Sequence, residues 1–330
     1  MSTKRPHTND KTEQKTKKPK NFNFLAHPRR KIALQFFYLG WEHDGLVQQP
    51  NTQNSVEHHL MEALLKTHLI DDWSKCEISR CGRTDKGVSA FRQTVALTVR
   101  SACGDQEGVF WDKNTSESQK KEFKSKEEEL PYIKMLNGVL PTSIRVFGWA
   151  PVSSDFSARF DCISRTYKYA FPKANMNLEK MRDGASRLIG EHDFSNFCQI
   201  DMNEKRLSQN YTRRIVDVTV EEVTTSPEDI YSLVELTVTG SGFLWHQIRY
   251  IVTVLNEIGR GNEEPELVSQ MLDLKRFASR PQYTIASDTP LCLFDCGYNE
   301  EAGVKWLTDE NVVRSTISKV QKTWATYQTR

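Results

Sequence analysis

Residues 79–93 read SRCGRTDKGVSAFRQ, and the alternating run VALTV at 95–99 follows them. Alternation with a period of two predicts a half-buried strand after the loop. Gly82 and Gly87 allow backbone conformations that other residues resist, so the segment between them can hold Asp85 on a turn outside any helix or strand. The stretch therefore predicts a loop that presents a carboxylate next to a strand.

Two basic residues, Arg83 and Lys86, flank this carboxylate. A guanidinium close to a carboxylate lowers the carboxyl pKa and fixes its orientation, which suits a nucleophile or base that must be charged at neutral pH. The alternative is that Asp85 caps a turn or a helix start while Arg83 and Lys86 are solvated, because Asp and Gly are the usual turn residues. The loop chemistry by itself leaves both interpretations open.

The ten residues CGRTDKGVSA at 81–90 resemble the active-site loop of the TruA family of tRNA pseudouridine synthases. The resemblance is nearest to the eukaryotic branch that modifies positions 38 and 39 of tRNA. It covers about 21–298 and includes SARFDCISRTYKY at 157–169 and GFLWHQIR at 242–249. It implies an α+β protein with the TruA-like pseudouridine synthase fold, in which two similar α/β halves join in one extended sheet with a central RNA cleft. The residue patterns themselves support only alternating strands and helices in two rough groups.

The same resemblance assigns roles to individual side chains. Asp85 is the expected catalytic carboxylate and Arg83 its partner, while Tyr167 is expected to stack on the target uracil and to take part in proton transfer. Arg249 lies among apolar neighbours and must find an acid or a phosphate, because a buried unpaired guanidinium is costly; the family places it near Asp85. The expected substrate contacts are Tyr167, Arg159, Arg165, Lys86, Leu291 and Leu293, and no metal ligands are expected.

Ordinary packing is the alternative for several of these residues. Three aromatic rings alternate along one predicted strand, namely Tyr167, Tyr169 and Phe171. Interleaved basic residues make this strand suited to bases and phosphates, yet core packing remains the interpretation for Tyr169 and Phe171. Strand packing likewise explains Leu291 and Leu293 almost as well as a uracil pocket does.

His192 and Asp193 also invite a catalytic interpretation. No third partner for them is evident in the sequence. We expect a turn-forming aspartate and a hydrogen-bonded histidine with structural roles.

Length and composition set the broad class. The chain has 330 residues, enough for one large domain or two ordinary ones. No apolar run is long enough to span a membrane and the N-terminus is basic and polar, so we expect a soluble intracellular protein of the nucleus and cytoplasm. The seven cysteines include no CxxC pair, which favours reduced, buried thiols. A formal charge of +2 is small, so an RNA-binding surface must come from local clusters of Arg and Lys.

We expect four divisions of the chain. Residues 1–20 form a basic disordered tail that acts as a nuclear address, an RNA tether or a simple solvated linker. The N-terminal half, 21–150, carries the aspartate loop and a charged insertion at 102–130, which is expected to be a mobile loop or a solvated helix. The C-terminal half is 151–298, and the extension at 299–330 is expected to form a surface helix.

Periodicity predicts several further elements. A strand is expected at 31–38, and a helix from an N-cap at Asn54 to about Lys66. Another helix is expected at 177–189. The alternating runs at 216–220 and 234–238 predict an antiparallel hairpin, and a helix that contains Arg249 should follow and end at Gly259 or Gly261.

The expected reaction converts uridine to pseudouridine: the N1 glycosidic bond breaks, the uracil turns, and C5 joins C1′. No electrons or groups pass to another molecule, so no cofactor is expected, and no dinucleotide or P-loop motif is present. Asp85 would act at the ribose, either by attacking C1′ or by taking a proton as a glycal-like species forms. The target nucleotide must leave its helix.

The expected partners are tRNA and, by resemblance, a second copy of the chain. One rival hypothesis is the same chemistry on other tRNA or small nuclear RNA uridines. Another is a tRNA-binding protein that does not catalyse. The presence of Arg83, Asp85, Tyr167 and Arg249 argues against this second rival, because a protein that only binds tRNA does not need the carboxylate of Asp85.

Overall fold

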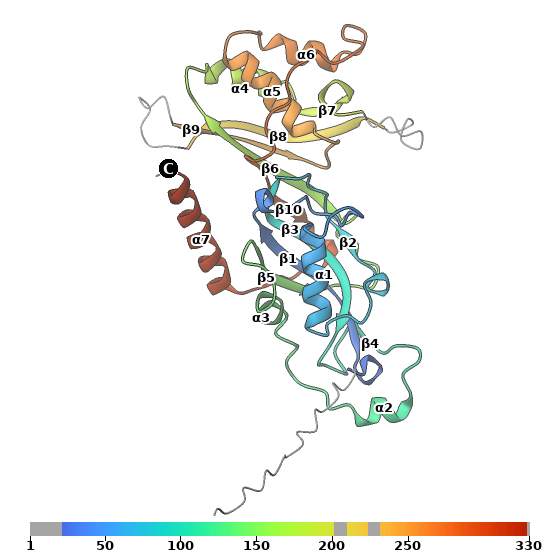
Figure 1. The fold of residues 1–330 in the computed structure, drawn as a ribbon. Helices are drawn as coiled ribbons and strands as arrows, with labels where there is room; N and C mark the ends of the chain where they lie inside the picture. Colours follow the sequence, from blue (N-terminus) through green and yellow to red (C-terminus); the bar gives the residue numbers. More distant parts are fainter. Residues whose placement is uncertain (1–21, 201–209, 224–231, 329–330) are drawn as a thin grey trace, which may run out of the picture.

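The computed structural model describes residues 22–200, 210–223 and 232–328, with side chains to residue 322 (Figure 1). The predicted tail at 1–20 lies outside this range. The strands are β1 Arg29–Tyr38, β2 Ser79–Arg80, β3 Ser89–Arg100, β4 Val109–Phe110, β5 Ile144–Pro151, β6 Cys162–Pro172, β7 Gly190–Asp193, β8 Thr212–Glu222, β9 Leu233–Gly240, β10 Leu291–Tyr298 and β11 Leu307–Thr308. The helices are α1 Val56–Lys66, α2 Glu117–Glu122, α3 Tyr132–Asn137, α4 Leu178–Ser186, α5 Gln247–Gly259, α6 Glu266–Leu272 and α7 Glu310–Gln328.

One continuous sheet runs through the molecule, in the order β11-β5-β1-β3-β10-β6-β9-β8-β7, with β2 paired to β3 and β4 to β1. Neighbouring strands are antiparallel except at the centre, where β10 runs parallel to β3. There Cys292 and Leu293 lie opposite Ser89 and Ala90. The prediction of two strand groups joined in one extended sheet is confirmed, and the aspartate loop leads into β3 at the junction of the two groups.

Two separate cores lie on the helix-covered side of this sheet. In the first, alternate residues of β1 pack against α1 and α3; in the second, alternate residues of β9 pack against α4, α5 and α6 (Figure 1). Tyr167 of β6 contacts both cores. Among the described residues, no helix is both long enough and apolar enough to cross a membrane.

The opposite face of the first strand group carries the chain's C-terminal helix. Phe37, Leu39 and Phe147 are buried there. They pack against Val313 and Val320 of α7, which runs along this side of the molecule (Figure 1). The extension therefore contains the expected helix, and it also adds β11 to the edge of β5.

The predicted helices and hairpin are present, with corrections at their ends. The N-cap of α1 is Ser55, whose hydroxyl accepts a bond from the N–H of His58, so the prediction of Asn54 is wrong by one residue. Helix α4 begins after its cap Asn177 but ends at Ser186, earlier than predicted. Strands β8 and β9 pair antiparallel, and α5 ends at Gly259, as expected.

Only part of the charged insertion at 102–130 is exposed to solvent. Helix α2 buries none of its residues, which agrees with the solvated-helix interpretation. The end of the insertion is different, because Glu129 pairs with Arg30 of β1 at 3.0 Å, with side chains only 7% and 6% exposed. A buried ion pair therefore ties this segment to the sheet, which a mobile loop would not have.

Candidate active site

Side chains from the sheet hold the backbone at the start of the aspartate loop. The carbonyl oxygen of Cys81 accepts a hydrogen bond from Nη2 of Arg165 at 3.0 Å. The next carbonyl, that of Gly82, accepts a bond of 3.2 Å from the amide of Gln93, a residue of β3 that is fully buried. Both contacts come from strands, so the entry to the loop has a fixed position.

The middle of the loop is anchored through Thr84. Its hydroxyl lies 2.6 Å from the hydroxyl of Tyr38, and its carbonyl accepts the N–H of Leu46 at 3.1 Å. One residue further, the carbonyl of Asp85 accepts the N–H of Val88 and closes a turn. The carbonyl of Asp85 is therefore used inside the loop, whereas its carboxylate contacts a residue outside it.

Gly87 ends this turn in a conformation that favours glycine, with φ +83°. A Cβ at this position would lie 2.9 Å from the carboxyl group of Asp288, which packs directly on the loop. Any larger residue would both strain the backbone and displace Asp288. Gly87 is therefore needed for the conformation that the loop has in this structure.

The carboxylate of Asp85 is half exposed, and within the described residues it forms an ion pair with a single basic side chain. Its side chain is 43% exposed, and Oδ2 lies 3.4 Å from Nε2 of His246, an ion pair when the imidazole is protonated. His246 precedes α5 and has a left-handed backbone, φ 61°, which is uncommon for a residue other than glycine. The sequence prediction missed His246; the only signal was its place within the GFLWHQIR stretch.

Arg83 and Lys86 both lie exposed on the loop. Within the described part of the chain, Arg83 makes no ion pair, and Lys86 pairs with Asp44 at 2.8 Å. The contact made by Asp85 is with His246 instead. Both basic side chains therefore remain accessible to a polyanion.

Tyr167 lies beside the loop, where the two cores meet. A Cβ on Gly82 would be 4.0 Å from its hydroxyl, and its ring packs edge-on against Phe243 with centroids 5.3 Å apart. Burial raises the pKa of the Tyr167 hydroxyl well above its ordinary value, so the group stays protonated at neutral pH. The structure brings Tyr167 and the aspartate loop together, as the sequence predicted.

Arg249 reaches the loop only through other residues. Its Nε donates to the carbonyl of Ala286 at 2.7 Å, and the N–H of Ala286 donates to Thr253 on the next turn of α5. Two residues later comes Asp288, which packs on Gly87. Arg249 thus holds the segment at 286–288, which packs against the aspartate loop. Among the described residues, Arg249 has no acid partner.

Arg165 has a fixed structural task. Its guanidinium donates to four backbone carbonyls at 2.7–3.1 Å, those of Cys162, Ser241, Cys81 and Arg159. This one side chain therefore joins three segments: the start of β6, the end of β9 and the start of the aspartate loop. Arg159 itself is exposed.

Leu291 and Leu293 are core residues of β10. They are 6% and 0% exposed and pair with Tyr169 and Tyr167 of β6. Strand packing accounts for both, and their contact with a uracil stays a prediction.

His192 and Asp193 have the structural roles that we expected. His192 contacts the carbonyl of Ile189 at 3.1 Å, and the carboxylate of Asp193 accepts the N–H of Ser195 at 2.8 Å. These are turn contacts at the end of β7, away from the aspartate loop in the sequence and in the sheet order.

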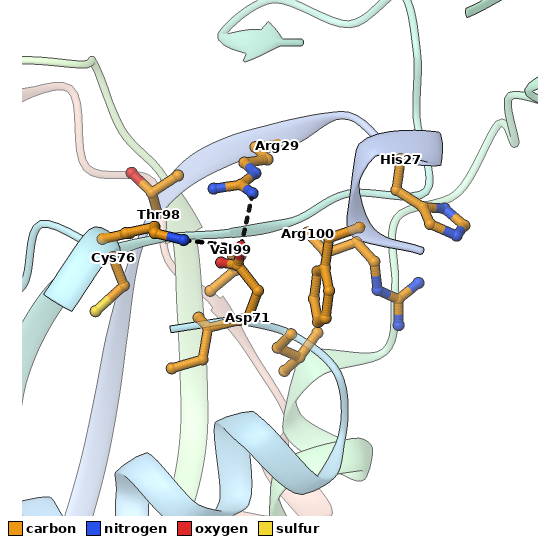
Figure 2. Close-up of a pocket in the computed structure, with 11 residues that line it drawn as sticks. His27, Arg29, Asp71, Cys76, Thr98, Val99 and Arg100 are labelled. Carbon is orange, nitrogen blue, oxygen red and sulfur yellow. Dashed lines mark hydrogen bonds and ion pairs between the residues drawn. The ribbon is translucent and has the colours of Figure 1, made fainter. Parts of the chain in front are cut away.

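A small pocket lies at the other end of β3, and Figure 2 shows its lining. Arg29 and Asp71 pair across it at 3.3 Å. The space is about 10 Å³, room for about one water molecule. None of the predicted site residues is among the described residues that line it, so this pocket lies outside the candidate active site.

Comparison with known proteins shows which protein family has sequences similar to this chain. The model of the tRNA pseudouridine synthase family matches residues 185–299. A Caenorhabditis elegans protein named probable tRNA pseudouridine synthase tag-124 is 67% identical over 331 residues, which cover 100% of this chain and 82% of that protein. The human tRNA pseudouridine(38/39) synthase is 39% identical over 313 residues, 93% of this chain and 63% of the human protein. The tRNA pseudouridine synthase A of Methanosarcina barkeri is 28% identical over 296 residues, 88% of this chain and 93% of that protein.

The match to the Caenorhabditis elegans protein covers both strand groups and the aspartate loop, whereas the family model covers part of the second group. The chain belongs to the TruA family of tRNA pseudouridine synthases. It spans less than two thirds of the human relative's length, so similarity alone does not transfer the activity of that longer protein to this chain.

Proposed function

We propose that this protein isomerises uridine to pseudouridine in the anticodon stem-loop of tRNA, at positions 38 and 39. The observation that carries the proposal is the half-exposed carboxylate of Asp85 on a turn whose preceding backbone is held by Arg165 and Tyr38. The position is supported by the names of the human and yeast relatives, tRNA pseudouridine(38/39) synthase, which are 39% and 38% identical to this chain.

The proposed chemistry is complete within the substrate. The C1′–N1 bond breaks and a C1′–C5 bond forms, while C5 loses a proton and N1 gains one. Asp85 acts at the ribose, by attack on C1′ or by removal of a ribose proton. Because nothing is oxidised and no group is donated, the reaction needs no cofactor.

Neighbouring side chains have supporting roles in this proposal. Tyr167, which is protonated and partly buried beside the loop, stacks on the detached base. His246 holds the Asp85 carboxylate, Arg83 and Lys86 attract the RNA backbone, and Arg249 supports the loop through Ala286. The family resemblance supports Asp85, Arg83, Tyr167 and Arg249 as the proposed catalytic set, and Arg159, Arg165, Lys86, Leu291 and Leu293 as the proposed substrate-binding set, in addition to the structural contacts that some of them make.

The proposed partners are tRNA and a second copy of the chain, and the proposed location is the nucleus and cytoplasm. The dimer is supported by the family resemblance, since one subunit could hold the body of the tRNA while the other reacts. Light scattering tests it: a mass of one chain at micromolar concentration would contradict the dimer. The basic stretch at 1–20 supports a nuclear location.

Replacing the carboxylate tests the catalytic assignment. We expect Asp85→Asn to lower the single-turnover rate on tRNA by more than about a thousandfold, with the Kd for tRNA within about threefold because the loop backbone is held by other groups. Asp44→Asn is the matched control, since Asp44 is a nearby carboxylate that pairs with Lys86. Turnover retained in Asp85→Asn would remove Asp85 from its role.

Mapping pseudouridine in RNA from cells that lack the protein separates the rival functions. Loss at positions 38 and 39 supports the proposal. Loss at other tRNA or small nuclear RNA uridines would instead support the same chemistry on another substrate. Unchanged modification together with tRNA binding would support a protein that binds without catalysis.

A further inference from the structure

Phe160 is far more exposed than any other large apolar side chain of the described residues. It is 80% exposed, and the next in order, Val216, is 55% exposed. A single exposed apolar residue is ordinary on a protein surface. What distinguishes Phe160 is the turn that carries it and the place of that turn in the molecule.

The turn at 157–161 is closed by its own hydrogen bonds. The carboxylate of Asp161 accepts the N–H of Ser157 at 2.7 Å, and the N–H of Asp161 donates back to the carbonyl of Ser157. The N–H of Phe160 donates to the Ser157 hydroxyl at 3.4 Å. The ring of Phe160 therefore projects from a backbone with little freedom to fold it back onto the protein.

Side chains from the sheet fix the same turn from outside. The N–H of Ala158 donates to the hydroxyl of Ser79 at 3.0 Å, and its carbonyl accepts the hydroxyl of Tyr298 at 2.8 Å. The protein thus holds an apolar ring in water on a rigid support. A partner that covers this ring would gain the free energy of burying it without having to order the ring's support.

Arg165 connects this turn directly to the aspartate loop. Its Nη2 donates both to the carbonyl of Arg159, at 2.8 Å, and to the carbonyl of Cys81, at 3.0 Å. The two carbonyls share one nitrogen, so the residue before Phe160 and the residue that opens the aspartate loop are neighbours in space. The segment that carries the exposed ring and the segment that carries Asp85 therefore meet at Arg165.

A cation accompanies the exposed ring. The guanidinium of Arg159 lies over the Phe160 ring, 5.4 Å from its centroid. A ring that can stack on a base next to a cation that can bind a phosphate is the combination that single-stranded and unpaired nucleotides favour. The chemistry of the turn therefore matches RNA better than a protein partner.

We propose that Phe160 enters the anticodon stem and stacks in the space that the flipped uridine leaves, while Arg159 contacts an adjacent phosphate. This inference rests on the proposed function, because it assumes that a uridine leaves its helix to reach Asp85. Apolar side chains that insert between bases are a known way to compensate for lost stacking. The contribution should be largest for a target that is base-paired, as at position 39 in the stem, and smaller for position 38 in the loop.

The test compares two RNAs that differ only opposite the target. One stem-loop has the target uridine paired, and the other has a mismatch that leaves it unpaired. We expect Phe160→Ala to lower the single-turnover rate at least about tenfold on the paired target but less than about threefold on the mismatched one, since stacking on an aromatic ring is worth that much for a single base. Phe160→Tyr keeps the ring and should stay close to the wild type. Ile163→Ala is the surface control, because Ile163 is exposed on nearby β6.

A second measurement does not depend on turnover. With 2-aminopurine next to the target, the wild type should raise the fluorescence as the uridine leaves the stack, and Phe160→Ala should not. Equal rate losses on both RNAs, or wild-type fluorescence in Phe160→Ala, would overturn the inference. A wild-type protein that raises the fluorescence but forms no pseudouridine in either RNA would overturn the proposed function and leave the stacking role supported.

Discussion

At the scale of single residues, the site has a fixed backbone and a free carboxylate. Bonds to Cys81, Gly82 and Thr84 hold the backbone that leads into Asp85, and the N–H of Val88 closes the turn on the Asp85 carbonyl, so the position of this residue does not have to be established when RNA binds. Preorganised charges are more effective in catalysis because they need little rearrangement in the transition state. The remaining freedom is the rotation of the Asp85 side chain, and His246 is the group that limits it.

This argument predicts a specific effect of His246. We expect His246→Ala to lower kcat on tRNA by about tenfold or more, with KM changed less than about threefold, because the imidazole contacts the acid and is not needed to bind the substrate. His246→Asn is the matched variant: asparagine also tolerates the left-handed backbone, so a loss of kcat there cannot be assigned to strain. If KM rises while kcat is unchanged, His246 binds RNA and does not position Asp85.

The sequence predicted Asp85 and Tyr167 as neighbours because each lies in a stretch that resembles the family's motifs. It could not predict His246, since its contact with Asp85 depends on how α5 is docked on the sheet. Nor could it predict the carbonyl partner of Arg249, which lies 37 residues further along the chain. Contacts between segments that are distant in the sequence depend on tertiary packing, and short sequence motifs do not predict them.

At the scale of elements, the structure connects the loop to strands from both groups. Arg165 joins β6, the end of β9 and the loop entry, while β10 lies parallel to β3 just after the loop. Because the loop depends on both groups, a change in either one should reach Asp85. The alternation of apolar residues predicted the individual strands. It did not predict the order in which they lie in the sheet, because that order is set by pairing between distant segments.

The charged insertion gives a prediction at this scale. Burial by itself would raise the pKa of Glu129, but bonds from the Ser101 hydroxyl, the N–H groups of Ala102 and Leu130, and Arg30 outweigh it and hold the pKa below its ordinary value. The lower folded pKa means that the carboxylate stabilises the fold above the ordinary glutamate pKa. That contribution is lost as the pH falls through the folded pKa.

We therefore expect Glu129→Gln to lower the free energy of unfolding by about 3 kcal/mol at pH 7, because it leaves Arg30 buried without its counter-charge. Urea unfolding measures this. The difference from the wild type should shrink as the pH falls from the ordinary glutamate pKa through the lower folded pKa, below which the folded wild-type glutamate is also neutral. Glu117→Gln, at an exposed ion pair of α2, is the control and should change stability by less than about 0.5 kcal/mol. A pH-independent difference would contradict the electrostatic explanation.

At the scale of the whole molecule, the two faces of the sheet have different tasks. The face that packs against α1, α3, α4, α5 and α6 carries the aspartate loop between the two cores. The other face of the first strand group is covered by α7 (Figure 1). A surface helix was expected in this extension, but the sequence did not predict the face that it covers, because Phe37 and Phe147 lie on strands whose two sides are both apolar. Strands buried on both faces have no alternation that shows which partner lies where.

This division of the faces predicts that α7 stabilises the protein without entering the chemistry. We expect Val320→Asp to lower the free energy of unfolding by about 2 kcal/mol, because it places a charge against Leu39, Phe37 and Phe147. Ile317→Asp, on the same helix at a side chain that is 40% exposed, is the matched control and should change it by less than about 0.5 kcal/mol. The single-turnover rate of the folded Val320→Asp protein should equal that of the wild type. A loss of rate at unchanged stability would mean that α7 acts on the site across the sheet.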